Sequence, residues 1–215
     1  MATTSLLALR SFPAFNELPE SELKHLASQM KLCSYAKKTT ILRQGEPSSH
    51  IYFLVSGFVK ITRGGELANQ YPGDKRGHQR KELALAIYGP GHMLGELASL
   101  AGTQRSASVI ALSDCNLIQL EHTAFIECAT RNPSVALFTM RYLASRLVES
   151  NRQIELLRSS VEARIIGLLR NLNQIDLPPE IFPSNAEIGR MVGASREMVS
   201  KVVSKMQGQP SSTPG

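Results

Sequence analysis

The stretch from Pro90 to Val109 holds the residues whose types and spacing could do chemistry. Glu96 directly follows Gly95, and Arg105 comes nine residues after Glu96, with Ser106 next to it. An arginine guanidinium can hold a phosphate through two parallel hydrogen bonds. An ionised glutamate only accepts hydrogen bonds, which suits a sugar hydroxyl. The pattern therefore fits a ligand with one phosphate and one ribose, such as a cyclic nucleotide.

The backbone around these residues is expected to leave room for a ligand. A Pro-Gly pair at Pro90 indicates a turn, and Gly95 lets the backbone approach a ligand closely. The segment after Gly95 can form a short helix whose first N–H groups would attract an anion. The alternative interpretation is a polar surface turn that happens to carry an arginine and a glutamate.

Composition places the chain among ordinary globular proteins. It has 215 residues, 42% of them hydrophobic, and a formal charge of +6. Most of the basic excess precedes residue 162, so charge alone does not predict nucleic-acid binding by the C-terminal third. The three cysteines (Cys33, Cys115 and Cys128) have no spacing typical of a zinc site or an iron–sulfur cluster. With no signal-peptide pattern and no long apolar run, we expect a cytoplasmic protein with reduced thiols and no membrane span.

The elements that must position the site begin with short helices between Leu6 and Met30, one of them starting after Pro19. The hydrophobic pattern then changes to a period of two, with glycine-rich turns between the runs, which predicts an antiparallel β-roll or jelly roll. The strand-like runs are 51–55, 58–61, 83–88, 108–111 and 116–120. The basic segment 74–81 is interpreted as a solvated hairpin tip, or else as an auxiliary contact to DNA or a partner.

A long helix is predicted to follow, with Asn132 as its cap and Pro133 as its first residue. Apolar residues recur at alternating spacings of four and three, which is a coiled-coil seam. The seam consists of Ala136, Met140, Leu143, Leu147, Ser150, Ile154, Leu157 and Val161. A helix of about 25 residues spans roughly 37 Å, so we interpret it as a dimer axis. Ser150 and Asn151 are polar there; they could fix the register, touch a ligand, or be tolerated small residues.

The C-terminal part carries the pattern of a helix-turn-helix. After an amphipathic helix (162–174) and a proline-rich loop, Ser184 and Glu187 have the spacing of a capping box. The helix they start is expected to stop at Gly193, and Ser195 is expected to cap a second helix that runs to Met206. That second helix would present Ser195, Arg196, Glu197 and Lys201 to the major groove, with Ser184 as a further DNA contact. The alternative is a solvated charged helix face.

With these motifs assembled, the chain resembles the CRP/FNR family of bacterial transcription regulators. The resemblance rests on Gly45 and Gly57, Gly-Glu-Leu at 95–97, Arg-Ser-Ala at 105–107, Asn132-Pro133 and Ser-Arg-Glu at 195–197. It implies that Glu96 contacts the ribose and that Arg105 and Ser106 grip the cyclic phosphate, with Gly95 and Leu97 in the same cassette. It also implies that Ser150 and Asn151 face the purine and that Arg196, Glu197 and Lys201 read bases.

The sequence departs from the family pattern in four ways. Asn151 replaces a hydroxyl residue and Lys201 replaces an arginine, which puts the purine and part of the DNA specificity in doubt. The spacing of nine between Glu96 and Arg105 is one shorter than in the enteric activator, and the cluster-binding cysteines of oxygen-sensing members are missing. The residues after Met206 contain no strand pair, so the usual wing hairpin is absent, and we expect weaker DNA affinity.

The sequence therefore predicts an α+β protein: an N-terminal antiparallel β-roll of the cyclic-nucleotide-binding type (1–131), a long dimerisation helix (132–160), a helix-turn-helix domain lacking a full wing (161–207) and a disordered tail (208–215). The expected function is a homodimeric transcription regulator that binds a palindromic double-stranded DNA site and contacts RNA polymerase. Its expected effector is cAMP, with no covalent cofactor, no metal and no catalytic residues.

Several alternatives stay open at this stage. The effector could be a cyclic dinucleotide, or there could be none, with Glu96 and Arg105 as an internal salt bridge. The chain could also be a nucleotide-binding dimer module without DNA function. His92 and Glu96, four residues apart, could ligate a metal in a cupin-like enzyme, although no suitably spaced further histidine accompanies them.

Overall fold

The computed structural model describes residues 2–64 and 83–207. The basic segment 74–81 and the tail 208–215 lie outside these residues, so the expectations for them stay predictions. The chain divides into two compact units, Met1–Arg146 and Leu147–Gly215. The division falls inside the long helix. The functional domain boundaries expected at 131 and 160 also stay predictions.

Two four-stranded antiparallel sheets make up the β-roll of the first unit. One sheet has the strand order β1-β8-β3-β6 and the other β2-β7-β4-β5. The bounds are β1 Met30–Tyr35, β2 Thr40–Leu42, β3 His50–Ser56, β4 Val59–Arg63, β5 Leu83–Tyr88, β6 Met93–Leu94, β7 Ser108–Ala111 and β8 Cys115–Glu121.

Strand β3 is buried on both faces because its side chains alternate between two cores. Ile51 and Phe53 belong to a core shared with the helices. Tyr52 and Leu54 belong to a second core, together with residues of β2, β4, β7 and β8. Successive side chains of a strand point to opposite faces, so one strand can serve both cores. This arrangement explains why the run from Ile51 to Val55 is almost continuously apolar.

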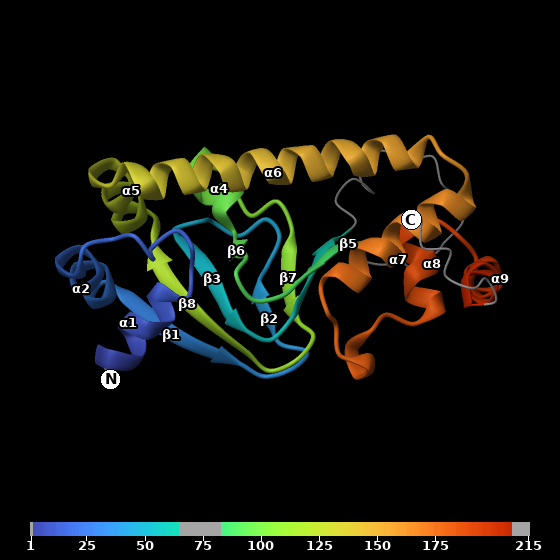
Figure 1. Ribbon diagram of the computed structural model, residues 1–215, viewed down its shortest axis with the longest axis horizontal. Coiled ribbons are helices and arrows are strands. Elements are labelled where there is room, and N and C mark those ends of the chain that lie inside the picture. The colour runs from blue at the N-terminus through green and yellow to red at the C-terminus, as the bar shows by residue number, and fades with distance from the viewer. Residues whose placement is uncertain (1, 65–82, 208–215) are drawn as a thin grey trace, which may run out of the picture. The chain divides into compact units, whose positions relative to one another are not determined.

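Helices cover one face of the sheet β1-β8-β3-β6 (Figure 1). They are α1 (Ala2–Arg10), α2 (Glu20–Ser28), α5 (His122–Arg131) and the beginning of α6 (Pro133–Leu157). Phe53 lies at the centre of their contact with the sheet. Its ring is 5.3 Å from that of Phe12, 5.1 Å from that of Phe15 and 6.0 Å from that of Phe125.

The structure confirms the five predicted strands and the helix that starts after Pro19. It adds strands β1, β2 and β6, which the sequence pattern did not reveal. β1 has no buried face of its own, because three of its six residues are exposed and the others are only partly buried. β2 and β6 have three and two residues, too few for a periodicity to show.

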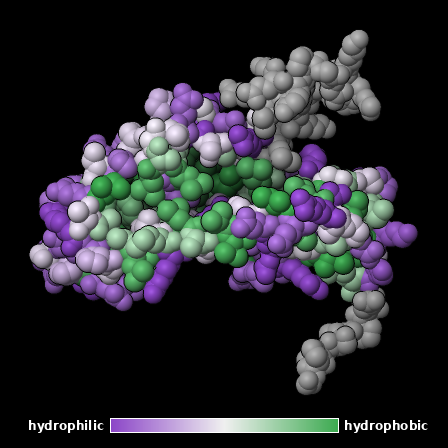
Figure 2. Space-filling view, turned by 90° about the horizontal axis from the view of Figure 1, so that it is seen from above, coloured by the Kyte–Doolittle hydropathy of each residue, from purple (hydrophilic) through white to green (hydrophobic). Residues whose placement is uncertain are grey.

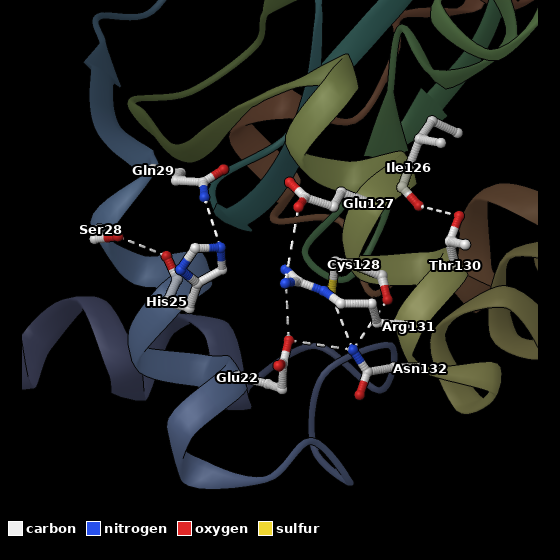
Figure 3. Close-up of polar contacts among 10 residues, drawn as sticks. All are labelled: Glu22, His25, Ser28, Gln29, Ile126, Glu127, Cys128, Thr130, Arg131 and Asn132. Atoms are coloured by element: carbon white, nitrogen blue, oxygen red, sulfur yellow. Dashed lines mark hydrogen bonds and ion pairs between the residues drawn. The ribbon is translucent and has the colours of Figure 1, made fainter.

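Asn132 occupies the start of α6, but its side chain does not cap that helix as expected. Its backbone carbonyl accepts the first helical hydrogen bond, from the Val135 N–H at 3.0 Å. The side-chain amide instead donates to the Cys128 carbonyl at 3.0 Å and to a carboxylate oxygen of Glu22 at 3.4 Å (Figure 3). Arg131 approaches the same carboxylate at 3.8 Å. Asn132 thus ends α5 and links it to α2. Its side-chain amide makes these contacts instead of capping α6.

Helix α6 has 25 residues, as the sequence predicted, and ends at Leu157. Val161, the last residue of the predicted seam, is the first residue of α7. Four apolar residues of the seam are strongly exposed: Met140 60%, Leu147 63%, Ile154 57% and Leu157 66%. Hydrophobic residues form a band on the face of the molecule shown in Figure 2. A single chain leaves this seam uncovered.

The second unit contains a small helical domain. Its elements are α7 (Val161–Gln174), a 3₁₀ turn η1 (Pro179–Ile181), α8 (Asn185–Val192) and α9 (Arg196–Gln207). Their core consists of Ile165, Leu169, Ile188, Val199 and Val202. Both predicted helices of the helix-turn-helix are therefore confirmed. Among the described residues, no helix is both long enough and apolar enough to cross a membrane.

Candidate functional site

The segment after β6 is shaped by two glycines in left-handed backbone conformations. Gly95 has a φ of 74° and starts helix α4 (Glu96–Ala101), and Gly102 has a φ of 65° and ends it. Only glycine adopts such angles without strain. The short helix expected after Gly95 is therefore present, and its first residue is Glu96.

Arg105 is held in place through both its backbone and its side chain. Its N–H donates to the Glu46 carbonyl at 2.9 Å, and its carbonyl accepts from the Gly45 N–H at 2.9 Å. The guanidinium donates to the carbonyls of Gly95 and His50, each at 2.7 Å. The side chain is 6% exposed. Two donors of the guanidinium are thus committed to the fold, and a guanidinium has five, so donors remain for a phosphate.

The carboxyl group of Glu96 is buried, and few interactions offset its loss of contact with water. It is 6% exposed. Burial raises its pKa to about 7, while a backbone hydrogen bond and the positive charge of Arg105 act in the opposite direction. In the described part of the chain, Arg105 donates to carbonyls and not to the Glu96 carboxylate. This geometry contradicts the alternative in which the two side chains form an internal salt bridge.

A cavity of about 70 Å³ brings together five of the seven predicted effector-binding residues, namely Gly95, Glu96, Leu97, Arg105 and Ser106. Apolar walls come from the roll, including Leu42, Ile61 and Val109. Ser150 and Asn151 belong to the second unit, where both are exposed on α6. Their contact with an effector stays a prediction.

The cavity also contains Arg146, which the sequence reasoning missed. Its guanidinium carbon lies 4.4 Å from the centre of the Tyr88 ring, a cation–π contact. A signal was available, because Arg146 precedes Ser150 by four residues and so shares its helix face. With two arginines against one carboxyl group, the cavity has an excess of positive charge that suits an anionic ligand.

The residues of the metal-site alternative have other contacts. His92 Nδ1 lies 3.0 Å from the Gly89 carbonyl, and its ring stacks on Tyr88 with 4.7 Å between centroids. Within residues 2–64 and 83–207, no group of three or more His, Cys, Asp or Glu side chains is arranged to hold a metal ion.

The turn between α8 and α9 depends on two glycines. Gly193 has a φ of 68° and ends α8. Gly189 lies inside α8, where an added Cβ would come within 2.6 Å of the Ala194 carbonyl oxygen. Position 189 therefore needs a residue without a side chain where the two helices meet. A hydrogen bond of 3.0 Å from Asn185 to Ser200 also joins the helices.

The predicted DNA-contacting residues of α9 lie on an exposed face. Ser195 caps the helix by accepting from the Met198 N–H at 3.2 Å. Arg196, Glu197 and Lys201 are exposed, whereas Val199 and Val202 face the core. Hydrogen bonds from its own N–H and from Ser195 lower the pKa of Glu197. Glu197 therefore stabilises the helix start, and its contact with a base stays a prediction.

Ser184 stands apart from that face in its bonding. Its hydroxyl donates to a carboxylate oxygen of Glu187 at 2.8 Å, and the reciprocal backbone bonds complete the predicted capping box. Near the other end of α9, Lys205 forms an ion pair with Glu162 of α7 at 2.9 Å. The capping box starts α8, and the ion pair joins α9 to α7.

Comparison with known proteins agrees with this architecture. Residues 32–132 match the model of the cyclic nucleotide-binding domain. The chain is 31% identical over 201 residues to the cyclic AMP receptor protein of Thermus thermophilus, covering 91% of this chain and 85% of that protein. It is 27% identical to the cAMP-activated global transcriptional regulator CRP of Haemophilus influenzae, covering 83% and 78%.

A solved structure shows a similar fold. The c-di-GMP responsive global regulator CLP of Xanthomonas campestris superposes with a TM-score of 0.64 at 22% identity, covering 88% of this chain and 92% of that one. The β-roll, the long helix and the helix-turn-helix occur in the order that the sequence predicted. The chain belongs to the CRP/FNR family of transcription regulators.

Proposed function

We propose that this protein is a homodimeric transcription regulator that acts on DNA in the cytoplasm and is gated by a cyclic nucleotide, with cAMP as the effector. The observation that carries the proposal is the cavity shared by Glu96, Arg105 and Arg146. The arginines supply positive charge and donors for a cyclic phosphate, and Glu96 supplies an acceptor for a ribose hydroxyl. The cAMP-named relatives support the choice of effector.

The hydrogen bonds that Arg105 makes without an effector determine which of its donors a phosphate could use. Its guanidinium already satisfies two carbonyls, so a phosphate would add charge-assisted bonds to the remaining donors rather than fill an empty site. A ribose hydroxyl that donates to Glu96 would favour the ionised carboxylate. Effector binding would then release a proton from part of the Glu96 population at pH values near 7.

The activity that the effector is proposed to control is DNA binding through α9. Arg196, Glu197 and Lys201 would read base edges, and two copies of α9 would lie about one DNA turn (~34 Å) apart on a palindromic site. The exposed seam of α6 would join the two chains, with functional parts at 1–131, 132–160 and 161–207. Contact with RNA polymerase would follow from its role as a regulator.

Isothermal titration with cAMP and cGMP tests the effector. Wild type should bind cAMP in the micromolar range, and Arg105→Ala should weaken binding at least about tenfold because charge-assisted bonds are lost. Arg43→Ala is a matched control, since Arg43 is exposed and pairs only with Glu46 in the described residues. Wild type that binds neither nucleotide would rule out the cAMP proposal.

A second candidate is a cyclic dinucleotide effector, favoured by the structural similarity to a regulator described as c-di-GMP responsive. The same titration with c-di-GMP decides between them. A gel-shift assay against a library of palindromic duplexes tests the DNA function. Absence of any effector-dependent shift would favour a nucleotide-binding dimer module without DNA function.

A further inference from the structure

The hydroxyl group of Tyr142, on α6, bonds to both backbone polar groups of Met93, on β6. It accepts a hydrogen bond from the Met93 N–H at 3.2 Å and donates one to the Met93 carbonyl at 3.1 Å. Met93 is 2% exposed, so both groups would otherwise be buried without a partner. The single hydroxyl of Tyr142 therefore satisfies one backbone donor and one backbone acceptor of Met93.

The N–H and the carbonyl of Met93 are not used in strand pairing because of the position of β6 in the sheet. Among residues 2–64 and 83–207, β6 is the edge strand of the order β1-β8-β3-β6 and pairs on one side only, with Tyr52 and Phe53 of β3. On that paired side, the His92 carbonyl accepts from the Leu54 N–H at 3.0 Å. The Met93 groups point to the opposite side, where another strand would normally lie. Tyr142 takes the place of that strand.

The same face of α6 contacts residues 88–93, the segment that leads into the cavity. Phe138, Tyr142 and Arg146 recur every four residues of α6, so they lie on one face of the helix. The Tyr142 ring lies 6.2 Å from that of Phe138 and 6.5 Å from that of His92. One turn further along, Arg146 covers Tyr88, which stacks on His92. The helix thus contacts residues 88–93 at both ends.

Residues 88–93 connect directly to the cavity, because Gly95 and Glu96 follow after Leu94. Burial raises the pKa of Tyr142, and the negative charge of Glu96 adds to the effect, which places the phenol within electrostatic reach of the carboxyl group. The hydroxyl therefore stays protonated and available as a donor at neutral pH. Met93 is two residues from Gly95 and hydrogen-bonds to Tyr142, so it connects the cavity segment to α6.

We propose that Tyr142 is a positioning residue that couples the Gly95–Glu96 segment of the cavity to α6 through its paired hydrogen bonds with Met93. The inference rests on the proposed effector function and assigns its regulation to a named contact. The residue does not line the cavity. It acts through Met93, so its loss should affect coupling more than effector binding.

The test compares full-length wild type with Tyr142→Phe, which keeps the ring and removes both hydrogen bonds. The matched control is Tyr35→Phe, which removes a hydroxyl on β1 from a residue that does not line the cavity. Each protein is titrated with cAMP by calorimetry. Its affinity for a palindromic duplex is then measured by fluorescence anisotropy with and without cAMP, at a temperature where circular dichroism shows each variant folded.

In Tyr142→Phe, the ratio of DNA affinities with and without cAMP should fall about tenfold, the effect expected from two lost hydrogen bonds. The affinity for cAMP should change no more than about threefold, because Arg105, Arg146 and Glu96 are unaltered. Tyr35→Phe should match wild type in both measurements. An unchanged ratio in Tyr142→Phe would overturn the proposal.

Hydrogen–deuterium exchange separates this inference from the proposed function. Without any effector, the peptide covering residues 88–97 should exchange faster in Tyr142→Phe and not in Tyr35→Phe, because the Met93 N–H loses its acceptor. If wild type binds no cyclic nucleotide, the proposed function fails. The exchange result then decides alone: faster exchange supports the positioning role, and unchanged exchange overturns it.

Discussion

The guanidinium of Arg105 donates to the backbone carbonyl of Gly95 across 2.7 Å, and a Cβ added at Gly95 would collide with that guanidinium. The glycine is therefore needed for two reasons: its φ of 74° and the space that Arg105 fills. The contact links the residue that starts α4 to the one proposed to hold the phosphate. It makes the backbone of the cavity depend on the side chain of Arg105.

Replacing Gly95 separates these two reasons. Gly95→Ala should lower the free energy of unfolding by about 2–4 kcal/mol, because backbone strain of about 1–2 kcal/mol adds to the displacement of Arg105. It should also weaken cAMP binding at least about tenfold. Gly91→Ala is the control, since Gly91 has a φ of 88° and open space around an added Cβ. Chemical denaturation and calorimetry check both, and equal effects of the two changes would contradict this account.

The buried carboxyl of Glu96 should make the stability of the first unit depend on pH. Its pKa is about 7 in the folded protein and about 4.5 in the unfolded chain. The folded state therefore holds more protons between these values, and stability falls as pH rises from about 4.5 to about 7. A difference of this size corresponds to about 3 kcal/mol.

Urea denaturation from pH 4 to pH 8, monitored by tyrosine fluorescence, measures this loss. Glu96→Gln removes the titrating group and should flatten the profile across the same range. A profile of wild type that rises instead would show that Glu96 is ionised and stabilised in the folded protein, contrary to the burial described above.

Glycine substitutions inside two helices should have opposite results. Gly189→Ala should destabilise the helix-turn-helix by about 1–3 kcal/mol, because the new Cβ would press on the rigid Ala194 carbonyl at 2.6 Å. Gly167→Ala in α7 should be neutral or stabilising by up to about 1 kcal/mol, since alanine favours a helix and its nearest neighbour is the flexible Leu156 side chain. Thermal melts and gel shifts check both variants, and DNA binding should be lost only in Gly189→Ala.

Charges placed in the exposed seam of α6 should separate the two chains of the proposed dimer. The double change Met140→Glu and Leu147→Glu puts carboxylates at two seam positions that are 60% and 63% exposed in a single chain. The dissociation constant of the dimer should rise at least about 100-fold, because burying unpaired charges costs several kcal/mol. Sedimentation velocity measures it. Arg141→Glu, at an exposed position beside the seam, should leave the dimer intact, and a double variant that stays dimeric would exclude α6 as the axis.

Much of the fold could be predicted because its signals are local. The apolar run of β3, the caps of α8 and α9, and the spacing along α6 all depend on neighbours within a few residues. Asn132 shows where such reasoning ends. It sits at the predicted cap position, but its amide bonds to Cys128 and Glu22, a partner 110 residues away. Strand β6 was missed because two residues show no period.

The sequence by itself determined the order of β-roll, long helix and helix-turn-helix, and the residue types that an effector and DNA would meet. The tertiary structure decided how those residues are set: that Arg105 donates to the carbonyls of Gly95 and His50, and that burial raises the pKa of Glu96. It also decided that Arg146 of α6 lines the cavity, whereas Tyr142 bonds to Met93 beside it. These facts depend on residues that are distant along the chain and meet only when the sheets and α6 pack. Local spacing reports the helices and turns, whereas burial and long-range hydrogen bonds exist only in the folded protein.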